Sequence, residues 1–299
     1  MEGQGSDMER LPAHAARAVL ALFAVVGAAV PVLSGCGPND AGEERRIIRE
    51  QHLPDAVSWV REDLARASAG VNRAAQQYAS VFVLTEPETR ERRLRQALHG
   101  ARRPPRAIPE FVPSPITFLV GIGTDGTVIA RDAEPDSLRG QDFGERYPVV
   151  AAALANGTRG RSLAEFVAEE GDARSVSMLF AAPARHEGHT VGAVAAAMPL
   201  WSVAQRVTRQ LRGNHAADIE RGVAIWAYVY EGDYIHHRGT PPDLDQLVPT
   251  REARTAALST SPGGYTGVIT LYSLRYGFGV LPVPQLGEDI GLVIFRSEP

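Results

Sequence analysis

The fold of this chain is decided by residues 116–131, which read ITFLVGIGTDGTVIAR. Two apolar runs, at 116–122 and 127–131, flank the polar corner Thr124-Asp125-Gly126. Glycine adopts the positive φ of a tight turn without steric cost, and an Asp-Gly corner between apolar runs is typical of a hairpin. The segment therefore predicts two neighbouring antiparallel strands.

A covering segment and three more strands are expected after this hairpin. Residues 132–143 predict a polar loop, and Tyr147-Pro148 opens an Ala-rich helix that ends near Gly157. Ser202 is expected to cap a later helix that Gly213 closes. The three strands are expected near 162–169, 174–183 and 190–199, with turns at 170–172 and 186–188.

The same order of elements returns in residues 222–298. A strand over 222–230, a turn and a partner over 234–238 precede a Pro-rich loop and a short helix near 250–258. Three strands near 264–272, 274–282 and 289–297 complete the pattern. The repeated order predicts an α+β protein with two similar modules, each a central five-stranded antiparallel sheet with covering helices.

A long amphipathic helix precedes both modules. From Leu53 to Val81 the apolar residues recur every three or four positions. A second helix is expected over 86–99, and an extended connector over 101–115. The apolar stripe of this helix is expected to pack against the chain's own sheets or to form the coiled-coil interface of a homodimer. The two interactions are compatible with each other.

The N-terminal residues predict export. The run Ala18–Val32 follows Arg10 and Arg17, as in a secretory signal peptide. Leu33-Ser34-Gly35-Cys36 resembles a bacterial lipobox, which implies that the thiol carries diacylglycerol with palmitate-type chains. Cys36 is the single cysteine, so it forms no internal disulfide. The alternative is an ordinary signal peptide or anchor helix with an incidental cysteine.

Composition narrows the class of protein further. The net charge is −4, which argues against a nucleic-acid partner. The chain has no lysine, which excludes a Schiff base and a P-loop lysine, and it has no second cysteine for a thiolate metal cluster. The pairs His186/His189 and His236/His237 lack the spacing of a metal site. No cofactor, metal or enzymatic activity is expected.

Several motifs carry a resemblance to a known family. They are the hairpin Gly123–Arg131, Gly140-Gln141-Asp142-Phe143, Pro148 with Ala151-Ala152-Ala153-Leu154, and Ala181-Ala182-Pro183 followed by Val191-Gly192-Ala193-Val194. Residues 116–200 resemble a Cache domain, and residues 50–298 resemble a double-Cache extracellular sensor. The expected parts are a signal peptide (1–35), a tether (36–50), N-terminal helices (51–100), a first Cache-like module (101–215) and a second PAS-like module (216–299).

The resemblance implies a ligand between the first sheet and the segment that covers it, residues 132–158. Guanidinium, hydroxyl and carboxylate groups that converge on an apolar cup suit a small ligand, and a carboxylate-bearing molecule is one candidate. The candidate residues are Arg131, Asp132, Arg139, Tyr147, Ser175 and Ser177. In the second module, aromatic residues alternate at Trp226, Tyr228 and Tyr230, so their side chains share one face of a strand. These side chains form either an aromatic-lined binding cup or part of the hydrophobic core.

Two functions from different classes follow. The first is a lipid-anchored small-molecule sensor on the periplasmic face of the outer membrane. The outer membrane is favoured because the residue after the cysteine is Gly37 and not Asp. The second is a structural or interaction lipoprotein of the cell envelope without a ligand. For either function, the expected protein partner is an envelope protein or a second copy bound through the N-terminal helix. The amino-acid-binding signature of double-Cache sensors, a Tyr-and-Arg-then-Trp-Tyr cluster, is missing from the sequence.

Overall fold

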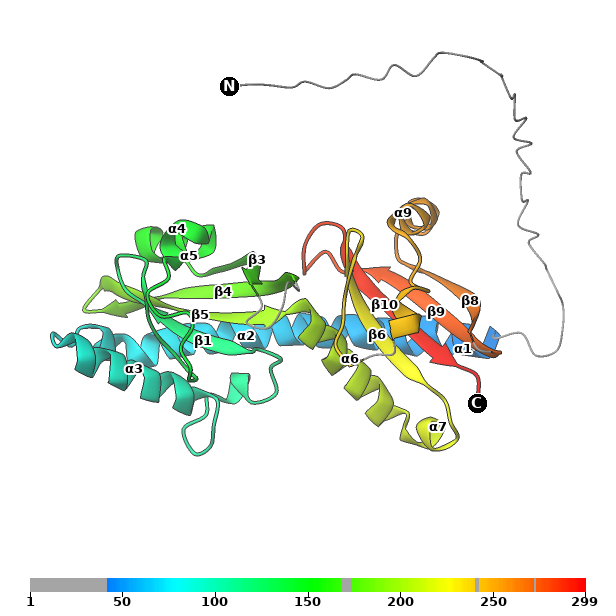
Figure 1. Cartoon of the computed structure of the whole chain (residues 1–299), viewed down its shortest axis with the longest axis horizontal. Helices are drawn as coiled ribbons and strands as arrows, with labels where there is room; N and C mark the ends of the chain where they lie inside the picture. Colours follow the sequence, from blue (N-terminus) through cyan, green and yellow to red (C-terminus); the bar gives the residue numbers. More distant parts are fainter. Residues whose placement is uncertain (1–41, 168–173, 240–241, 272) are drawn as a thin grey trace, which may run out of the picture. The chain divides into compact units, whose positions relative to one another are not determined.

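The computed structural model describes residues 42–167, 174–239, 242–271 and 273–299. The leader with Cys36, and the turn expected at 170–172, lie outside these residues. The described chain is an α+β protein with two five-stranded antiparallel sheets and a long N-terminal helix (Figure 1). The predicted fold class is thereby confirmed.

The first sheet has the order β2-β1-β5-β4-β3. A hairpin turn at Gly126 joins β1 to β2, as its Asp-Gly corner predicts, and Gly126 has a φ of 89°. Residues 186–189 form the turn between β4 and β5, with Gly188 at a φ of 83°. The strands are β1 (Phe118–Ile122), β2 (Val128–Arg131), β3 (Gly160–Val167), β4 (Arg174–His186) and β5 (His189–Pro199).

The second sheet has the order β7-β6-β10-β9-β8, which repeats the order of the first. The topological duplication expected from the sequence is therefore present. Its strands are β6 (Ile225–Glu231), β7 (Tyr234–His236), β8 (Tyr265–Leu271), β9 (Leu274–Pro282) and β10 (Ile290–Ser297).

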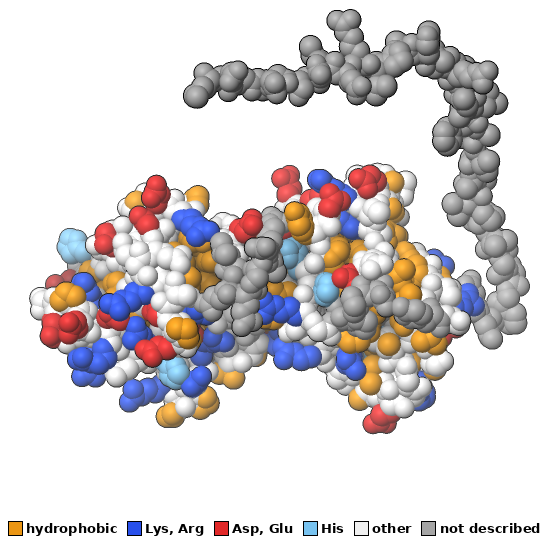
Figure 2. All heavy atoms as spheres, viewed as in Figure 1, with side chains coloured by type: hydrophobic (Ala, Val, Ile, Leu, Met, Phe, Trp, Pro, Cys, Tyr) orange, Lys and Arg blue, Asp and Glu red, His pale blue; other side chains and the backbone are white. Residues whose placement is uncertain are grey.

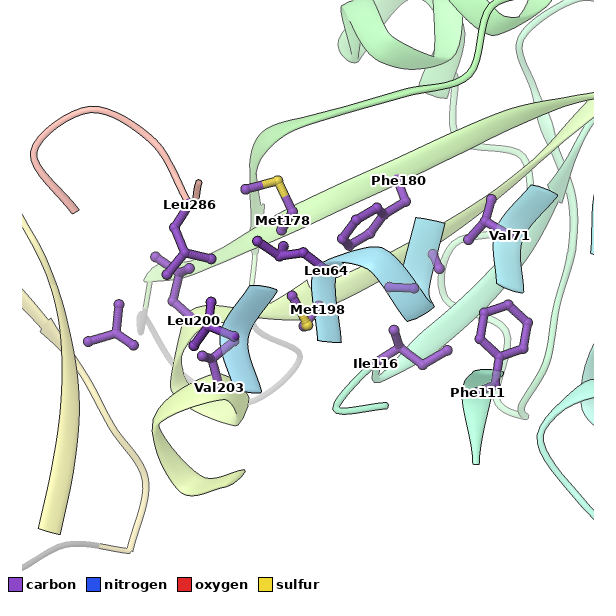
Figure 3. Close-up of a cluster of buried hydrophobic side chains, with 14 of the residues drawn as sticks. Leu64, Val71, Phe111, Ile116, Met178, Phe180, Met198, Leu200, Val203 and Leu286 are labelled. Carbon is purple, nitrogen blue, oxygen red and sulfur yellow. The ribbon is translucent and has the colours of Figure 1, made fainter. Parts of the chain in front are cut away.

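The predicted long helix is α2 (Leu53–Phe82). Its apolar stripe packs on the face of the first sheet formed by alternate residues of β4 and β5. In Figure 3, Leu64 of α2 lies beside Met178 and Phe180 of β4. The same hydrophobic cluster continues into β6 and β10 of the second sheet, so α2 contributes to a core that both sheets share.

The chain is already helical before α2, within the residues expected to form the tether. Helix α1 (Gly42–Ile47) continues into a π-helical turn (Ile48–His52) that leads directly into α2. A Cβ at Gly277 of β9 would lie 3.0 Å from the backbone nitrogen of Arg45, so glycine permits this close approach. Residues 42–50 are thus packed on the second sheet rather than extended.

Helix α3 (Pro87–Ala101) confirms the second predicted helix, and a short 3₁₀ turn (Pro109–Phe111) interrupts the connector. The cover of the first sheet consists of α4 (Phe143–Arg146) and α5 (Pro148–Asn156). Asp142 caps α4, because its side chain accepts a hydrogen bond from the backbone N–H of Glu145 at 2.8 Å. The cover of the second sheet consists of α8 (Pro242–Asp245) and α9 (Arg251–Thr260).

Helix α6 (Leu200–Asn214) and the short α7 (Ala216–Glu220) connect the two sheets. The prediction that Ser202 caps α6 was wrong: the helix starts at Leu200, and the Ser202 hydroxyl donates to the carbonyl of Pro199 at 2.7 Å. Helix α6 also runs one residue past Gly213. The guanidinium of Arg206 donates to buried Asp63 at 2.5 Å, which ties α6 to α2.

Candidate functional site

The candidate site is the face of the first sheet that α4 and α5 cover. Alternate residues of every strand point to this side and form a hydrophobic cluster separate from the one around α2. The cover contributes Phe143, Tyr147, Val149, Val150 and Ala153 to the same cluster. The sheet and its cover therefore enclose an apolar layer.

Four aromatic rings fill much of this layer at one end of the sheet. The centroids of Phe118 and Phe166 lie 5.3 Å apart, and those of Phe143 and Tyr147 lie 4.8 Å apart, both nearly perpendicular. Tyr147 also lies 5.3 Å from Phe166. Edge-to-face contacts of this kind are favourable beyond the buried area alone.

Arg131 lies at the rim of this ring cluster. It pairs with Val120 across the β1–β2 ladder, and both residues lie on the covered face. Its guanidinium is 5.5 Å from the centroid of Phe118, and its Nη1 donates to the Ser137 hydroxyl at 3.3 Å. The position allows an arginine fork to reach an anion at the edge of the apolar layer.

Tyr147 is buried, and its hydroxyl donates to the carbonyl of Glu165 at 3.4 Å. Burial raises the pKa of Tyr147 above its usual value, although the nearby Arg146 opposes the shift. The phenol therefore stays protonated at neutral pH and keeps a hydrogen-bond donor inside the layer.

Ser175 and Ser177 lie on β4, opposite Phe166 and Ala164 of β3. Their positions alternate with those of Val176 and Met178, which face α2, so both serines belong to the covered face. Ser177 is buried. Arg131, Tyr147, Ser175 and Ser177 are thus brought to the same face and the same end of the sheet.

The side chains of Asp132 and Arg139 bind residues in and around α3 instead of facing the apolar layer. One carboxylate oxygen of Asp132 accepts from the backbone N–H of Leu119 at 3.0 Å, and the other from Arg102 at 2.9 Å. Arg102 also donates to backbone carbonyls just before β1, so Asp132 joins the end of α3 to the sheet. Arg139 is mostly exposed and pairs with Glu91 of α3 at 2.6 Å.

In the second module, the aromatic alternation on β6 belongs largely to the core. Tyr228 and Tyr230 are buried with Phe278 and Phe295. Burial raises the pKa of Tyr230 to about 12, and the Arg254 guanidinium lies 4.2 Å from its ring centroid. Trp226 is partly exposed, so it is the member of the alternation that remains accessible.

A buried polar cluster that the sequence does not indicate joins His52, His215, Asp218 and Arg296. The Nε2 atoms of His52 and His215 lie 3.1 Å apart, and His215 Nδ1 lies 3.3 Å from Asp218. Asp218 in turn accepts from buried Arg296 at 2.7 Å. Burial, with help from His215 and Arg296, lowers the pKa of His52 to about 3. His52 and His215 are 163 positions apart in the sequence, so no local sequence pattern predicts their contact.

The described residues contain neither a metal-binding cluster nor a membrane-spanning helix. Within residues 42–167, 174–239, 242–271 and 273–299, no group of three His, Cys, Asp or Glu side chains is placed to hold a metal ion. In the same residues, every helix is too short or too polar to cross a bilayer.

Comparisons with known proteins agree at the level of the fold. No protein-family model matches the chain, and no curated protein is similar to it in sequence. The ligand-binding domain of the Campylobacter jejuni chemoreceptor Tlp3 with L-norvaline has a TM-score of 0.54 and 10% identity, over 88% of this chain and 96% of that one. The same domain with isoleucine has a TM-score of 0.53 and 10% identity, over 88% and 98%.

The sensor domain of the Vibrio cholerae histidine kinase DctB has a TM-score of 0.50 and 12% identity, over 86% of this chain and 99% of that one. Each of these matches covers at least 86% of this chain and at least 96% of the other. The chain therefore shares the fold of these ligand-binding and sensor domains.

Proposed function

We propose that this chain is a lipid-anchored, extracytoplasmic sensor that binds a small molecule between the first sheet and helices α4 and α5. The observation that carries the proposal is the gathering of Arg131, Tyr147, Ser175 and Ser177 around buried aromatic rings on that face. An apolar layer with a few convergent polar groups is the common form of a small-molecule site.

The polar groups favour a ligand with a carboxylate. A guanidinium binds a carboxylate with two parallel hydrogen bonds, while the Tyr147 phenol and the serine hydroxyls fix its orientation. The C. jejuni domain is named in complex with L-norvaline and with isoleucine, both of which carry a carboxylate. The likeness in fold supports a carboxylate-bearing ligand and does not identify the rest of the ligand.

Binding in this layer requires the cover to move. The rings of Phe143 and Tyr147 on the cover contact each other, and Tyr147 contacts Phe166 on the sheet. A ligand of a few heavy atoms must separate at least one of these contacts. A ligand that favours the opened arrangement shifts the position of α4 and α5, which is how binding becomes a signal.

The binding site is tested by substitution of Arg131. A thermal-shift screen of carboxylates, amines and purines on the full chain identifies a ligand, since a compound bound to the native state raises the melting temperature. Arg131→Ala is then expected to weaken its binding at least about tenfold, through loss of a charge-assisted bidentate contact. Tyr147→Phe is expected to weaken it less, because the ring remains.

The matched control is Arg93→Ala, which removes the same charge from the exposed surface of α3. It is expected to leave the affinity within about twofold of the wild type. Equal affinities for Arg131→Ala and the wild type would contradict the proposed site.

The lipid anchor is a separate prediction. The lipobox-like Leu33-Ser34-Gly35-Cys36 supports acylation of Cys36 at the outer membrane. Cys36→Ser is expected to move the chain from the detergent-rich phase to the aqueous phase in a detergent partition assay, because acyl chains supply the membrane affinity. Mass spectrometry of the wild type is expected to show an acylated Cys36 at the mature N-terminus, and an unmodified Cys36 would contradict the anchor.

A ligand-free interaction protein is the second candidate. The packing of Phe118, Phe143, Tyr147 and Phe166 against one another favours it, because these rings already satisfy the apolar face of the cover. Such a protein presents its surface to an envelope protein or pairs with a second copy through α2. A screen in which no compound raises the melting temperature supports this candidate over the sensor.

A further inference from the structure

A hollow in the second module lies where α6 passes the outer edge of β6. Its volume is about 270 Å³. Thr208 of α6 holds the helix against this edge, since its hydroxyl accepts from the backbone N–H of Ala227 at 2.9 Å. The lining residues are Ala204, Gln205, Thr208, Arg209 and Arg212 of α6, Trp226 and Ala227 of β6, and His237, Arg238 and Gly239 after β7.

Three arginines converge on this hollow. Arg209, Arg212 and Arg238 all line it, and all three are exposed. In the described part of the chain, none of the three forms an ion pair with a carboxylate, whereas Arg206 on the same helix binds Asp63. Among the lining side chains, His237 lies 2.7 Å from the carboxylate of Asp245. The hollow therefore carries an excess of positive charge.

Aromatic rings orient two of these arginines. The guanidinium of Arg212 lies 5.3 Å from the ring centroid of Trp226, and that of Arg238 lies 4.1 Å from the ring centroid of Trp201. Stacking on an aromatic face fixes the plane of a guanidinium while its N–H groups stay available at the edge. The carbonyl of Arg238 also accepts from the Gln205 amide at 3.0 Å, which holds this segment to α6.

We propose that this hollow binds a small molecule with two or more negative charges on carboxylate or phosphate groups. A planar fork of N–H donors matches both groups, and three such forks around one hollow favour an anion with more than one charged group. In Figure 2, basic side chains (blue), which in this lysine-free chain are arginines, lie over α6. The volume is near the lower end of the range for small-molecule sites, so a compact ligand fits.

The test uses two probes and a double variant of the full chain. Citrate and inorganic phosphate are titrated separately by calorimetry at about 10 mM salt, where charges are screened little because the Debye length is about 30 Å. Arg209→Gln/Arg212→Gln is expected to weaken binding of the recognised probe at least about tenfold. The control Arg92→Gln/Arg93→Gln removes the same charge from α3 and is expected to change it less than about twofold.

The two titrations show whether the hollow binds an anion and which class of anion it binds. Binding of citrate alone assigns a polycarboxylate, and binding of phosphate alone assigns a phosphate-bearing ligand. Binding of neither probe, or equal weakening in both double variants, overturns the proposal. Should the α6 double variant unfold, Arg238→Gln is measured in its place with the same expectation. Arg131→Ala is expected to leave this binding unchanged, so this site and the one on the first sheet succeed or fail separately.

Discussion

Acidification from pH 6.5 to pH 3 is expected to lower the free energy of unfolding by up to about 5 kcal/mol through His52. Burial holds the pKa of His52 at about 3 in the folded chain, against an ordinary value of 6.5. Between these two values the unfolded chain binds the proton and the folded chain does not. Stability is therefore complete above pH 6.5 and is lost as the pH falls toward 3.

The neighbours of His52 explain why the folded chain rejects this proton. Its ring is fully buried at the end of the π-helical turn that precedes α2, and His215 and Arg296 both disfavour a positive charge on it. Asp218 favours the charge, but it is already paired with Arg296 and Arg221. The cluster thus has more cationic partners than its carboxylate can neutralise.

The measurement is urea denaturation at pH 7 and at pH 4.5. The wild type is expected to lose about 3 kcal/mol more between these values than His52→Phe, which keeps an aromatic ring at this position and cannot be protonated. The exposed His189 provides the control, since His189→Phe is expected to leave the pH dependence of the wild type unchanged. Parallel pH profiles for the wild type and His52→Phe would contradict the explanation.

Phe180→Ala is expected to lower the free energy of unfolding by about 3 to 5 kcal/mol. The ring is 1% exposed and lies against α2 in the core that both sheets share (Figure 3). Its removal loses the transfer free energy of the side chain and leaves a cavity that the rigid sheet cannot close. Because the core is shared, the melting of both modules is expected to shift together.

Thermal and urea denaturation measure this loss. Val112→Ala is the control, because Val112 is 60% exposed and truncation there is expected to cost less than about 0.5 kcal/mol. Two separate melting transitions, of which only one shifts in Phe180→Ala, would show that the modules do not share a core.

The strands and the long helix could be predicted because their signal is periodic and local. Strand β1 is buried at every position and is a continuous apolar run, whereas burial alternates along β2. The three-to-four spacing of α2 likewise follows from the side of the helix that is buried. Helix α1 gives no such signal, because its sequence GEERRI is charged. What holds it is the close approach of Gly277, more than 200 residues away, and no local pattern encodes that contact.

The positions of the candidate residues in the fold could be predicted only in part, for a related reason. The placement of Arg131 follows from its position on β2, but Asp132 is the next residue and must leave the strand on the other side. Its bond to Arg102 of the α3 end could not be foreseen from a spacing of 30 residues. The packing of Phe118 with Phe166 likewise depends on strand order, which brings β1 and β3 residues to one end of the sheet.

Hydrogen exchange with and without the most stabilising compound of the thermal-shift screen tests the proposed binding site most directly. The account predicts slower exchange of backbone amides in the cover, residues 143–156, and in the facing strands β3 and β4. Protection confined to the second module, or a screen in which no compound stabilises the chain, would contradict it.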